Sequence, residues 1–306
     1  MKKSDKIKFL SLRLAILWLI IMGMLGVNGV MAQVDSIASA PAQSKTSFVK
    51  NTFGGNLILE NQTVMVPIKG TFEFVIQHKF GTVNNGFEDF FGMFAPSNIR
   101  LGLNYVPIDK LQLGIGLTKN SYLLDFNAKY ALVKQAKSGG WPVSITAFGN
   151  MAIDCRSGDN FVSSTDRISY FTQLIIARKF SDKISLQVSP SATYFNNVEG
   201  YVDEKGDIQP KMDNLHFAIA FMGRYRMTNS LSLLLNYDQP LTQHLTNNPH
   251  PNISAGLEVN TSSHDFQVIF GNYYYIVPQY NNFFNQNDFT KGQFQIGFNI
   301  SRLWNF

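Results

Sequence analysis

Residues 97–118 read SNIRLGLNYVPIDKLQLGIGLT, and this stretch decides the fold class. From Ile99 to Tyr105, and again from Leu111 to Leu117, every second residue is apolar and those between are polar or glycine. A period of two is typical of a β-strand, whereas a helix repeats every 3.6 residues. The Val-Pro-Ile-Asp-Lys break between the runs has the residues of a tight turn. The stretch therefore predicts two antiparallel strands joined by a turn.

The same alternation recurs along the rest of the chain. A run begins at Thr71, and further runs occupy residues 122–133, 143–153, 168–180, 184–195, 215–227, 231–238, 252–259, 265–272 and 292–304. Together with the two opening runs this makes twelve predicted strands. Most have about the 9 to 11 residues that a tilted strand needs to cross a membrane.

The links between the runs alternate in length. Four are tight turns of similar sequence, such as Phe-Ser-Asp-Lys at residues 180–183. Most of the others are long and rich in polar and aromatic residues, as at 196–214 and 273–291. Short turns at one end, long loops at the other and an even strand number are typical of a transmembrane β-barrel. We therefore predict an all-β fold, a single transmembrane antiparallel barrel of about 12 strands.

The start of the chain has the layout of a targeting segment. Lysines and Arg13 precede an apolar run from Leu14 to Val30, and a small residue, Ala32, follows. This predicts a secretory signal peptide at residues 1–32, cleaved after Ala32, with an uncleaved anchor helix as the alternative. We expect residues 33–69 to form a periplasmic leader that can hold a short strand, and residues 70–306 to form the barrel.

Composition narrows the class of protein further. Of 306 residues, 45% are hydrophobic and only 15% are charged, and Cys155 is the one cysteine. A disulfide framework and a cysteine-rich metal site are thus excluded. Most of the +5 formal charge comes from the N-terminal segment, so no nucleic-acid partner is expected.

The two faces of the predicted strands separate a soluble barrel from a membrane one. The face opposite the apolar one carries small and uncharged polar residues, as at Ser185, Gln187, Ser189 and Ser191. A solvated exterior would carry frequent Lys and Glu, whereas a crowded lumen suits these residues. We expect a multi-pass barrel in the bacterial cell outer membrane, with outer-membrane lipid around it.

The last strand resembles the C-terminal signal by which barrel-assembly machinery recognises its substrates. Trp304 and Phe306 end a run of apolar residues of one parity, and the chain stops at an aromatic residue. The usual pattern has Gly where Ser301 stands. Trp304 and Phe306 are our predicted insertion signal, and the assembly machinery is an expected partner.

Four segments resemble a known family. They are KGTFEFVIQHKFG at residues 69–81, SNIRLGLNY at 97–105, QLIIARKF at 173–180 and FNISR at 298–302. They are similar, in order and spacing, to a Gram-negative β-barrel family of unknown function (domain of unknown function 5777). The resemblance implies an outer-membrane barrel and carries over no activity or catalytic residue.

Charges of both signs fall on the inward face, and in a narrow lumen they should pair. They are Glu73, Arg100, Asp125, Lys129, His216, Arg224, Arg226, Asp238 and Glu258. A barrel of this size has an intermediate bore that such pairs could fill or narrow. We expect a narrow pore or a binding protein for a small solute. The alternatives are a non-conducting adhesion or scaffold barrel and, less favoured, a barrel hydrolase.

Residues for chemistry are few. A barrel hydrolase needs a nucleophile near His78 or His216, and neither has a serine two positions further on. His244 and His250 could meet over a metal in a folded loop, but two histidines without a third ligand usually mark a polar loop. We expect no enzymatic activity, no cofactor and no metal. We expect the aromatic residues in the loops at 86–94 and 272–284 to be exposed. They would form either an aromatic girdle at the membrane surface or a binding surface.

Overall fold

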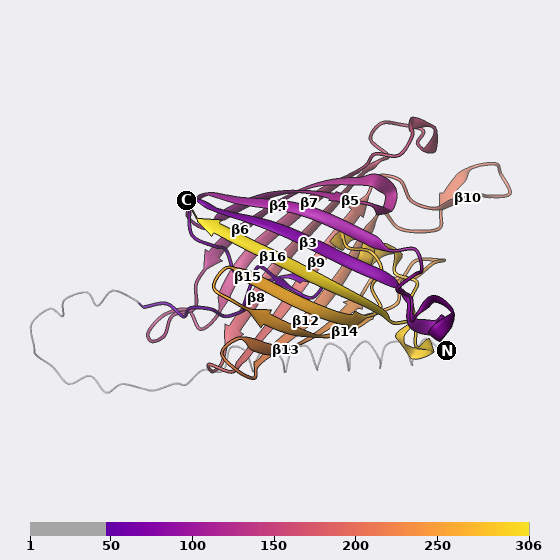
Figure 1. Ribbon diagram of the computed structural model, residues 1–306. Coiled ribbons are helices and arrows are strands. Elements are labelled where there is room, and N and C mark those ends of the chain that lie inside the picture. The colour runs from indigo at the N-terminus through magenta and orange to yellow at the C-terminus, as the bar shows by residue number, and fades with distance from the viewer. Residues whose placement is uncertain (1–46, 306) are drawn as a thin grey trace, which may run out of the picture.

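The computed structural model describes residues 47–305, and in it twelve antiparallel strands close into one barrel (Figure 1). The predicted fold is confirmed. The ring closes where β16 (Gln295–Asn305) pairs with β3 (Thr71–Thr82), with Asn305 opposite Thr71 and Ile300 opposite Ile76. The predicted signal peptide at 1–32 lies outside the described residues.

The other strands of the wall follow one another around the ring in chain order, each paired with its neighbours in sequence. They are β4 (Asn98–Ile108), β5 (Leu111–Thr118), β6 (Leu123–Val133), β7 (Ser144–Asp154), β8 (Ile168–Lys179), β9 (Ile184–Phe195), β12 (Leu215–Arg226), β13 (Leu231–Pro240), β14 (Asn252–Asn260) and β15 (His264–Gly271). A separate hairpin, β10 (Gly200–Val202) with β11 (Ile208–Pro210), projects from the long loop between β9 and β12.

The alternation read from the sequence becomes the two faces of this wall. On β5, Leu113, Ile115 and Leu117 are exposed, whereas Gln112 and Thr118 point inward and are buried. An exposed aliphatic face is favourable only against hydrocarbon, because in water it would form an apolar patch. Within residues 47–305, no helix is long and apolar enough to cross a membrane.

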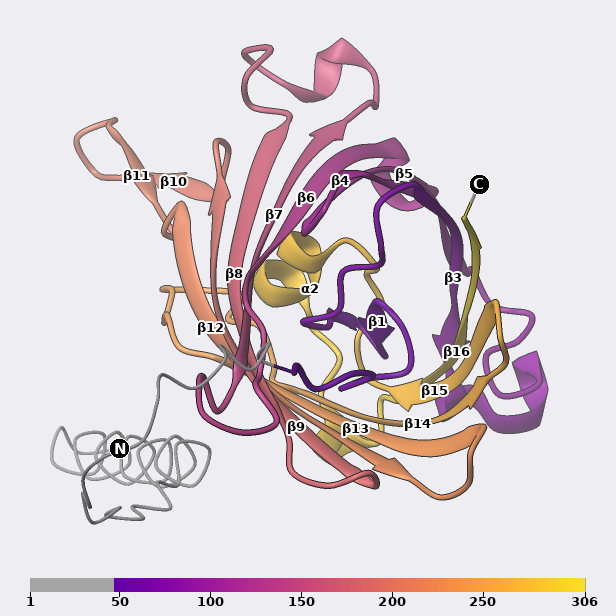
Figure 2. The same ribbon diagram turned by 90° about the vertical axis from the view of Figure 1, so that its left-hand side faces the viewer.

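The lumen contains a segment that the sequence placed elsewhere. Residues 53–64, which we call the plug segment, run inside the barrel and carry a small hairpin, β1 (Leu57–Ile58) with β2 (Asn61–Gln62) (Figure 2). Phe53, Ile58 and Leu59 are buried against inward side chains of the wall. The short strand expected within residues 33–69 is present as this hairpin, but residues 53–64 lie in the lumen and not in a periplasmic leader. Their burial depends on contacts with distant strands, which alternation along the sequence does not reveal.

A second segment closes the lumen from the long-loop end. The loop after β15 folds inward and forms α2 (Pro278–Phe284), which lies inside the ring in Figure 2. Tyr273, Tyr280 and Phe283 are buried, so our expectation that this loop exposes its aromatics is wrong. These side chains pack against inward apolar groups of the wall, such as Leu123 and Phe195.

The remaining short helices lie in links at the long-loop end of the barrel. They are η1 (Val83–Asp89), η2 (Asn120–Tyr122), η3 (Gly158–Asn160) and η4 (Phe289–Lys291). Of these, η2 is in the short link between β5 and β6. The loop that contains η1 does expose its aromatics, with Phe87 and Phe94 each more than four-fifths exposed. The two aromatic loops predicted alike thus differ: one fills the lumen and the other extends from the barrel.

Candidate functional site

The lumen wall carries a buried ion pair that spans three strands. Arg100 on β4 donates to Asp125 on β6 through Nε to Oδ2 and through Nη2 to Oδ1, each at 2.8 Å. Asn150 on β7 donates to the same carboxylate at 2.8 Å, and Arg100 Nη1 donates to Gln77 Oε1 at 3.1 Å. A bidentate arginine–carboxylate pair is among the stronger polar contacts in proteins.

Gly116 on β5 makes room for this pair. It lies between the two charged strands, opposite Gly102 on one side and Asp125 on the other. A side chain at Gly116 would collide with both the Arg100 guanidinium and the Asp125 carboxylate. The absence of a side chain at this position therefore leaves space in the lumen for the ion pair.

A second ion pair lies on another part of the ring. Arg224 on β12 donates through Nε to Glu258 Oε2 on β14 at 2.7 Å, and through Nη2 to Asn260 Oδ1 at 3.2 Å. Gly54 and Gly55 of the plug segment approach this region so closely that a Cβ at Gly54 would lie 2.6 Å from Glu258 Oε2, and one at Gly55 would collide with Asp265. A side chain at either position would therefore have to displace these carboxylates.

Glu73 and Lys129 hold the plug segment instead of pairing with each other. Asn56 Nδ2 donates to Glu73 Oε2 at 2.7 Å, and Asn104 of the wall donates to the same oxygen at 2.8 Å. Lys129 Nζ donates to Gln62 Oε1 at 3.0 Å and to the carbonyl of Asn56 at 3.3 Å. Both wall charges are almost fully buried beneath the segment they bind.

Asp238 makes the corresponding contact on β13. Asn61 of the plug segment donates through Nδ2 to Asp238 Oδ1 at 2.9 Å, and Asn252 of β14 donates to Oδ2 at 2.8 Å. The sequence analysis missed the neighbouring pair, in which Lys79 Nζ on β3 donates to Glu60 Oε1 at 2.5 Å. Lys79 shares the inward parity of Glu73, so that strand's alternation could have revealed it.

His216 lies in the lumen beside α2, where it meets a loop histidine. His244 Nδ1 accepts the backbone N–H of Asp213 at 3.0 Å, which leaves its Nε2 to donate to His216 Nδ1 at 3.1 Å. The ring of Phe283 lies against both histidines. Burial lowers the pKa of His244, and the nearby Asp213 carboxylate opposes this shift only in part.

The other predicted residues lie apart from these contacts. Arg226 is half-buried at the end of β12, outside both ion pairs. The Arg302 guanidinium lies over the Trp304 ring, 5.0 Å from the ring centroid. Phe306 lies outside the described residues. His78 faces outward and stacks on Phe298, so it does not line the lumen.

The suggested meeting of His244 and His250 does not occur. His244 faces His216, whereas His250 Nδ1 lies 4.0 Å from an Asp288 carboxylate oxygen. Among residues 47–305, no group of three or more His, Cys, Asp or Glu side chains could hold a metal ion. The described part of the lumen wall combines amides, hydroxyls and charged groups with apolar side chains such as Phe148 and Phe171.

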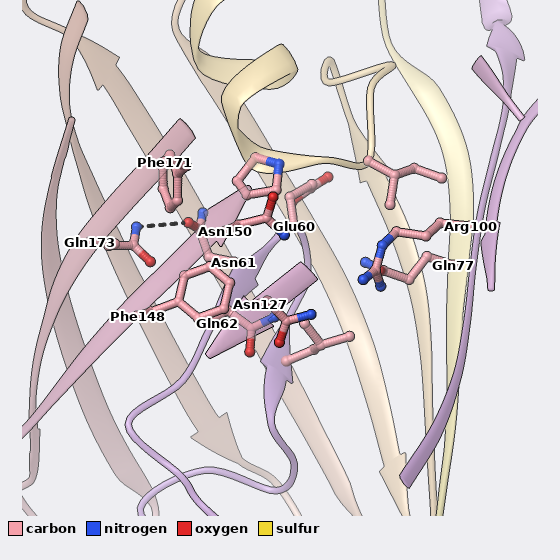
Figure 3. Close-up of a pocket in the computed structure, with 13 residues that line it drawn as sticks. Glu60, Asn61, Gln62, Gln77, Arg100, Asn127, Phe148, Asn150, Phe171 and Gln173 are labelled. Atoms are coloured by element: carbon pink, nitrogen blue, oxygen red, sulfur yellow. Dashed lines mark hydrogen bonds between the residues drawn. The ribbon is translucent and has the colours of Figure 1, made fainter. Parts of the chain in front are cut away.

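A small cavity remains between the plug segment, α2 and the wall. Its volume is about 30 Å³, and amide groups, the Arg100 guanidinium and two phenyl rings border it (Figure 3). Figure 3 shows Phe148, Phe171 and Gln173 on one side and Arg100 with Gln77 on the other. A water molecule needs about 10–15 Å³ of such volume, so the space admits about two waters and no larger solute.

A closed antiparallel barrel with an apolar exterior and a polar interior is the architecture of an outer-membrane β-barrel. The chain belongs to the family described as "Membrane bound beta barrel domain" (domain of unknown function 5777), whose model matches residues 53–304. This match confirms the resemblance drawn from the sequence. It includes the whole plug segment.

Solved outer-membrane proteins are similar to this chain. The NanC porin matches with a TM-score of 0.46 and 7% identity, over 77% of this chain and 99% of that one. The KdgM porin matches with a TM-score of 0.42 and 8% identity, over 77% of this chain and 99% of that one. The toluene transporter TodX from Pseudomonas putida matches with a TM-score of 0.40 and 9% identity, over 79% of this chain and 91% of that one. No curated protein compared with the chain matches it.

Proposed function

We propose that the protein is a gated passage for a small polar solute across the outer membrane, and that the plug segment is its gate. The observation that carries this proposal is the polarity of the contact between plug segment and wall. Asn56, Asn61 and Gln62 each bond to a charged wall residue, and Thr146 of β7 donates to the carbonyl of Val64 at 2.9 Å.

Such contacts hold a gate without making its release prohibitive. A hydrogen bond to a charged group contributes about 1.5–3 kcal/mol net, because both groups bond to water once they separate. A lumen meant to stay filled could be lined by apolar side chains, which pack without the cost of desolvating charges. The polar wall beneath the plug segment suits water as well as it suits the plug segment.

The apolar part of the plug segment opposes release. Phe53, Ile58, Leu59 and Val64 pack in one cluster with inward side chains of the wall, such as Phe171. Fully burying a side chain of this size is worth about 1.5–3 kcal/mol, so this cluster favours the closed state. We expect the unmodified barrel to be closed most of the time.

The route for release lies at the short-turn end of the barrel. The chain leaves the plug segment through Val66 and Pro67 and reaches the rim at Ile68, which is 71% exposed. Gly70, with a φ of 84°, then turns the backbone into β3. The chain before the plug segment is held at the same end, because Val49 donates to the carbonyl of Gln135 and Phe48 pairs with Ala136. Release therefore frees a loop that stays anchored at both ends while the wall remains closed.

Two other functions remain alternatives. A non-conducting adhesion or scaffold barrel is favoured by the fact that the plug segment and α2 both occupy the lumen. A barrel hydrolase has less support, because His216 bonds to His244 and His78 faces outward, so the described residues place neither beside a serine hydroxyl.

Solute entry into proteoliposomes separates these possibilities. The variant replaces residues 53–64 by a Gly/Ser linker of equal length, and a shift in gel mobility on boiling verifies that the barrel has folded. We expect the variant to admit small neutral sugars much faster than the unmodified protein, with the rate falling as the sugar grows. If a folded variant stays impermeable even when the α2 loop is also shortened, the passage is rejected and the scaffold is favoured.

A further inference from the structure

A groove of about 620 Å³ runs along the outside of the wall, where β6, β7, β8, β9 and β12 follow one another. Its outward lining consists mostly of small side chains between larger apolar ones. The small ones include Ala128, Ala147, Gly149 and Ala192, and the larger ones include Tyr130 and Phe217. Its volume falls within the range of about 300–1,000 Å³ that is usual for small-molecule sites.

The outer face beside the groove is also unusually well covered. Val188 of β9 and Ile219 of β12 have the parity of the lipid-facing side, yet they are only 3% and 8% exposed. They pack with the outward side chains of Ile176 and Phe221. Elsewhere on the outer face, equivalent positions such as Leu117 and Leu257 are about half exposed.

Pro190 explains why the wall departs from regular pairing at this place. The β8–β9 ladder is continuous on both sides of Pro190, but Leu174 and Ile175 have no paired residue opposite them. On its other side, Pro190 still pairs with Ile219 of β12. A proline has no N–H to donate, so the missing donor is the one that would face β8.

The groove reaches toward the lumen. Phe148 and Gln173 border both the groove and the small internal cavity, so the wall at these two residues is all that separates them. Gly149, next to Phe148, contributes no side chain to the outer face. A Cβ at this position would meet only the carbonyl oxygen of Phe171, at 3.8 Å, so the groove has room for one.

We propose that this groove binds one acyl chain of a membrane lipid. The groove is continuous with the lipid-facing surface of the barrel, so hydrocarbon is the medium that reaches it. If the groove were empty, the side chains that line it would have no contacts on one side and would lose the dispersion energy of those contacts. A flexible linear chain can follow a groove lined mostly by small side chains.

The test uses phosphatidylcholine with a diazirine midway along one acyl chain, mixed into vesicles that contain the full-length barrel. After illumination, mass spectrometry compares the lipid attached to peptides of β7–β9 with that attached to the outward face of β14. A preference of about 1.4 kcal/mol for the groove over ordinary lipid contact gives about tenfold enrichment. Equal labelling of the two faces would overturn the proposal, because it would show only the lipid that surrounds any barrel.

Two variants check that the groove itself is responsible. Gly149→Leu with Ala192→Leu fills the groove with side chains, and Ala255→Leu makes a similar change on the outward face of β14. We expect the filled groove to lose the enrichment and the Ala255 variant to keep it, in protein that still shifts its gel mobility on boiling. Undiminished enrichment in the filled variant would also overturn the proposal.

Discussion

The guanidinium of Arg100 meets the carboxylate of Asp125 through two hydrogen bonds of 2.8 Å, and the pair crosses the intervening strand at Gly116. Asp125 is fully buried, and the Arg100 side chain is 11% exposed. The pair ties three consecutive strands together on the inside of the barrel. A carboxylate buried this deeply depends on its cation, because an unpaired buried charge is costly.

Arg100→Ala should therefore destabilise the barrel strongly. The substitution leaves Asp125 buried with Asn150 as a remaining donor, and losing one partner of a buried pair costs about 3–5 kcal/mol. Urea unfolding in detergent measures the change in free energy. The double variant Arg100→Ala with Asp125→Asn removes the charge as well, so it should be more stable than the single one. A loss below about 1 kcal/mol for Arg100→Ala would show that water reaches the carboxylate.

Arginine on the outer face tests how the barrel sits in the lipid. Leu235 points outward in the middle of β13, and Ile184 points outward at the short-turn end of β9. Leu235→Arg should cost about 2–4 kcal/mol and Ile184→Arg about 0–1 kcal/mol, because the cost falls from the midplane to the interface. Folding into vesicles at increasing urea gives both values. Equal costs would contradict the assigned membrane depth.

The histidine pair beneath α2 should make the fold less stable in acid. The pKa of His244 is lowered in the folded protein, so the unfolded chain binds a proton first as the pH falls below about 6.5. Above that pH the histidine is neutral in both states and has no effect. Unfolding of the unmodified protein and of His244→Gln should be compared at pH 7 and pH 5. The stability loss between these pH values should be smaller in the variant, and an identical loss would contradict this role.

The barrel could be predicted from the sequence because its wall obeys a local rule. Strands such as β5 and β13 alternate over eight residues or more, and every inward position follows from the parity of one outward leucine. The turns add an independent signal, since their lengths alternate along the chain. Each of these signals comes from residues that are close together in the sequence, so no knowledge of distant contacts is needed to read it.

The contents of the lumen could not be predicted in the same way. Inward parity identifies Arg224 and Glu258 as facing the lumen, but the contact between them depends on how the strands are staggered around the ring. The plug segment has too short a pattern, and its burial depends on contacts such as that between Asn61 and Asp238, 177 positions apart. The aromatics near Tyr280 read as a membrane girdle because composition alone does not tell inward from outward folding of a loop.

The current through single barrels in a planar bilayer tests most directly whether the plug segment is a gate. We expect the unmodified protein to stay closed with rare openings. The Gly/Ser replacement of residues 53–64 should conduct steadily, and Gly55→Val should open more often than the unmodified protein, because its side chain would collide with Asp265. A folded replacement variant with no more current than the unmodified protein would contradict the account.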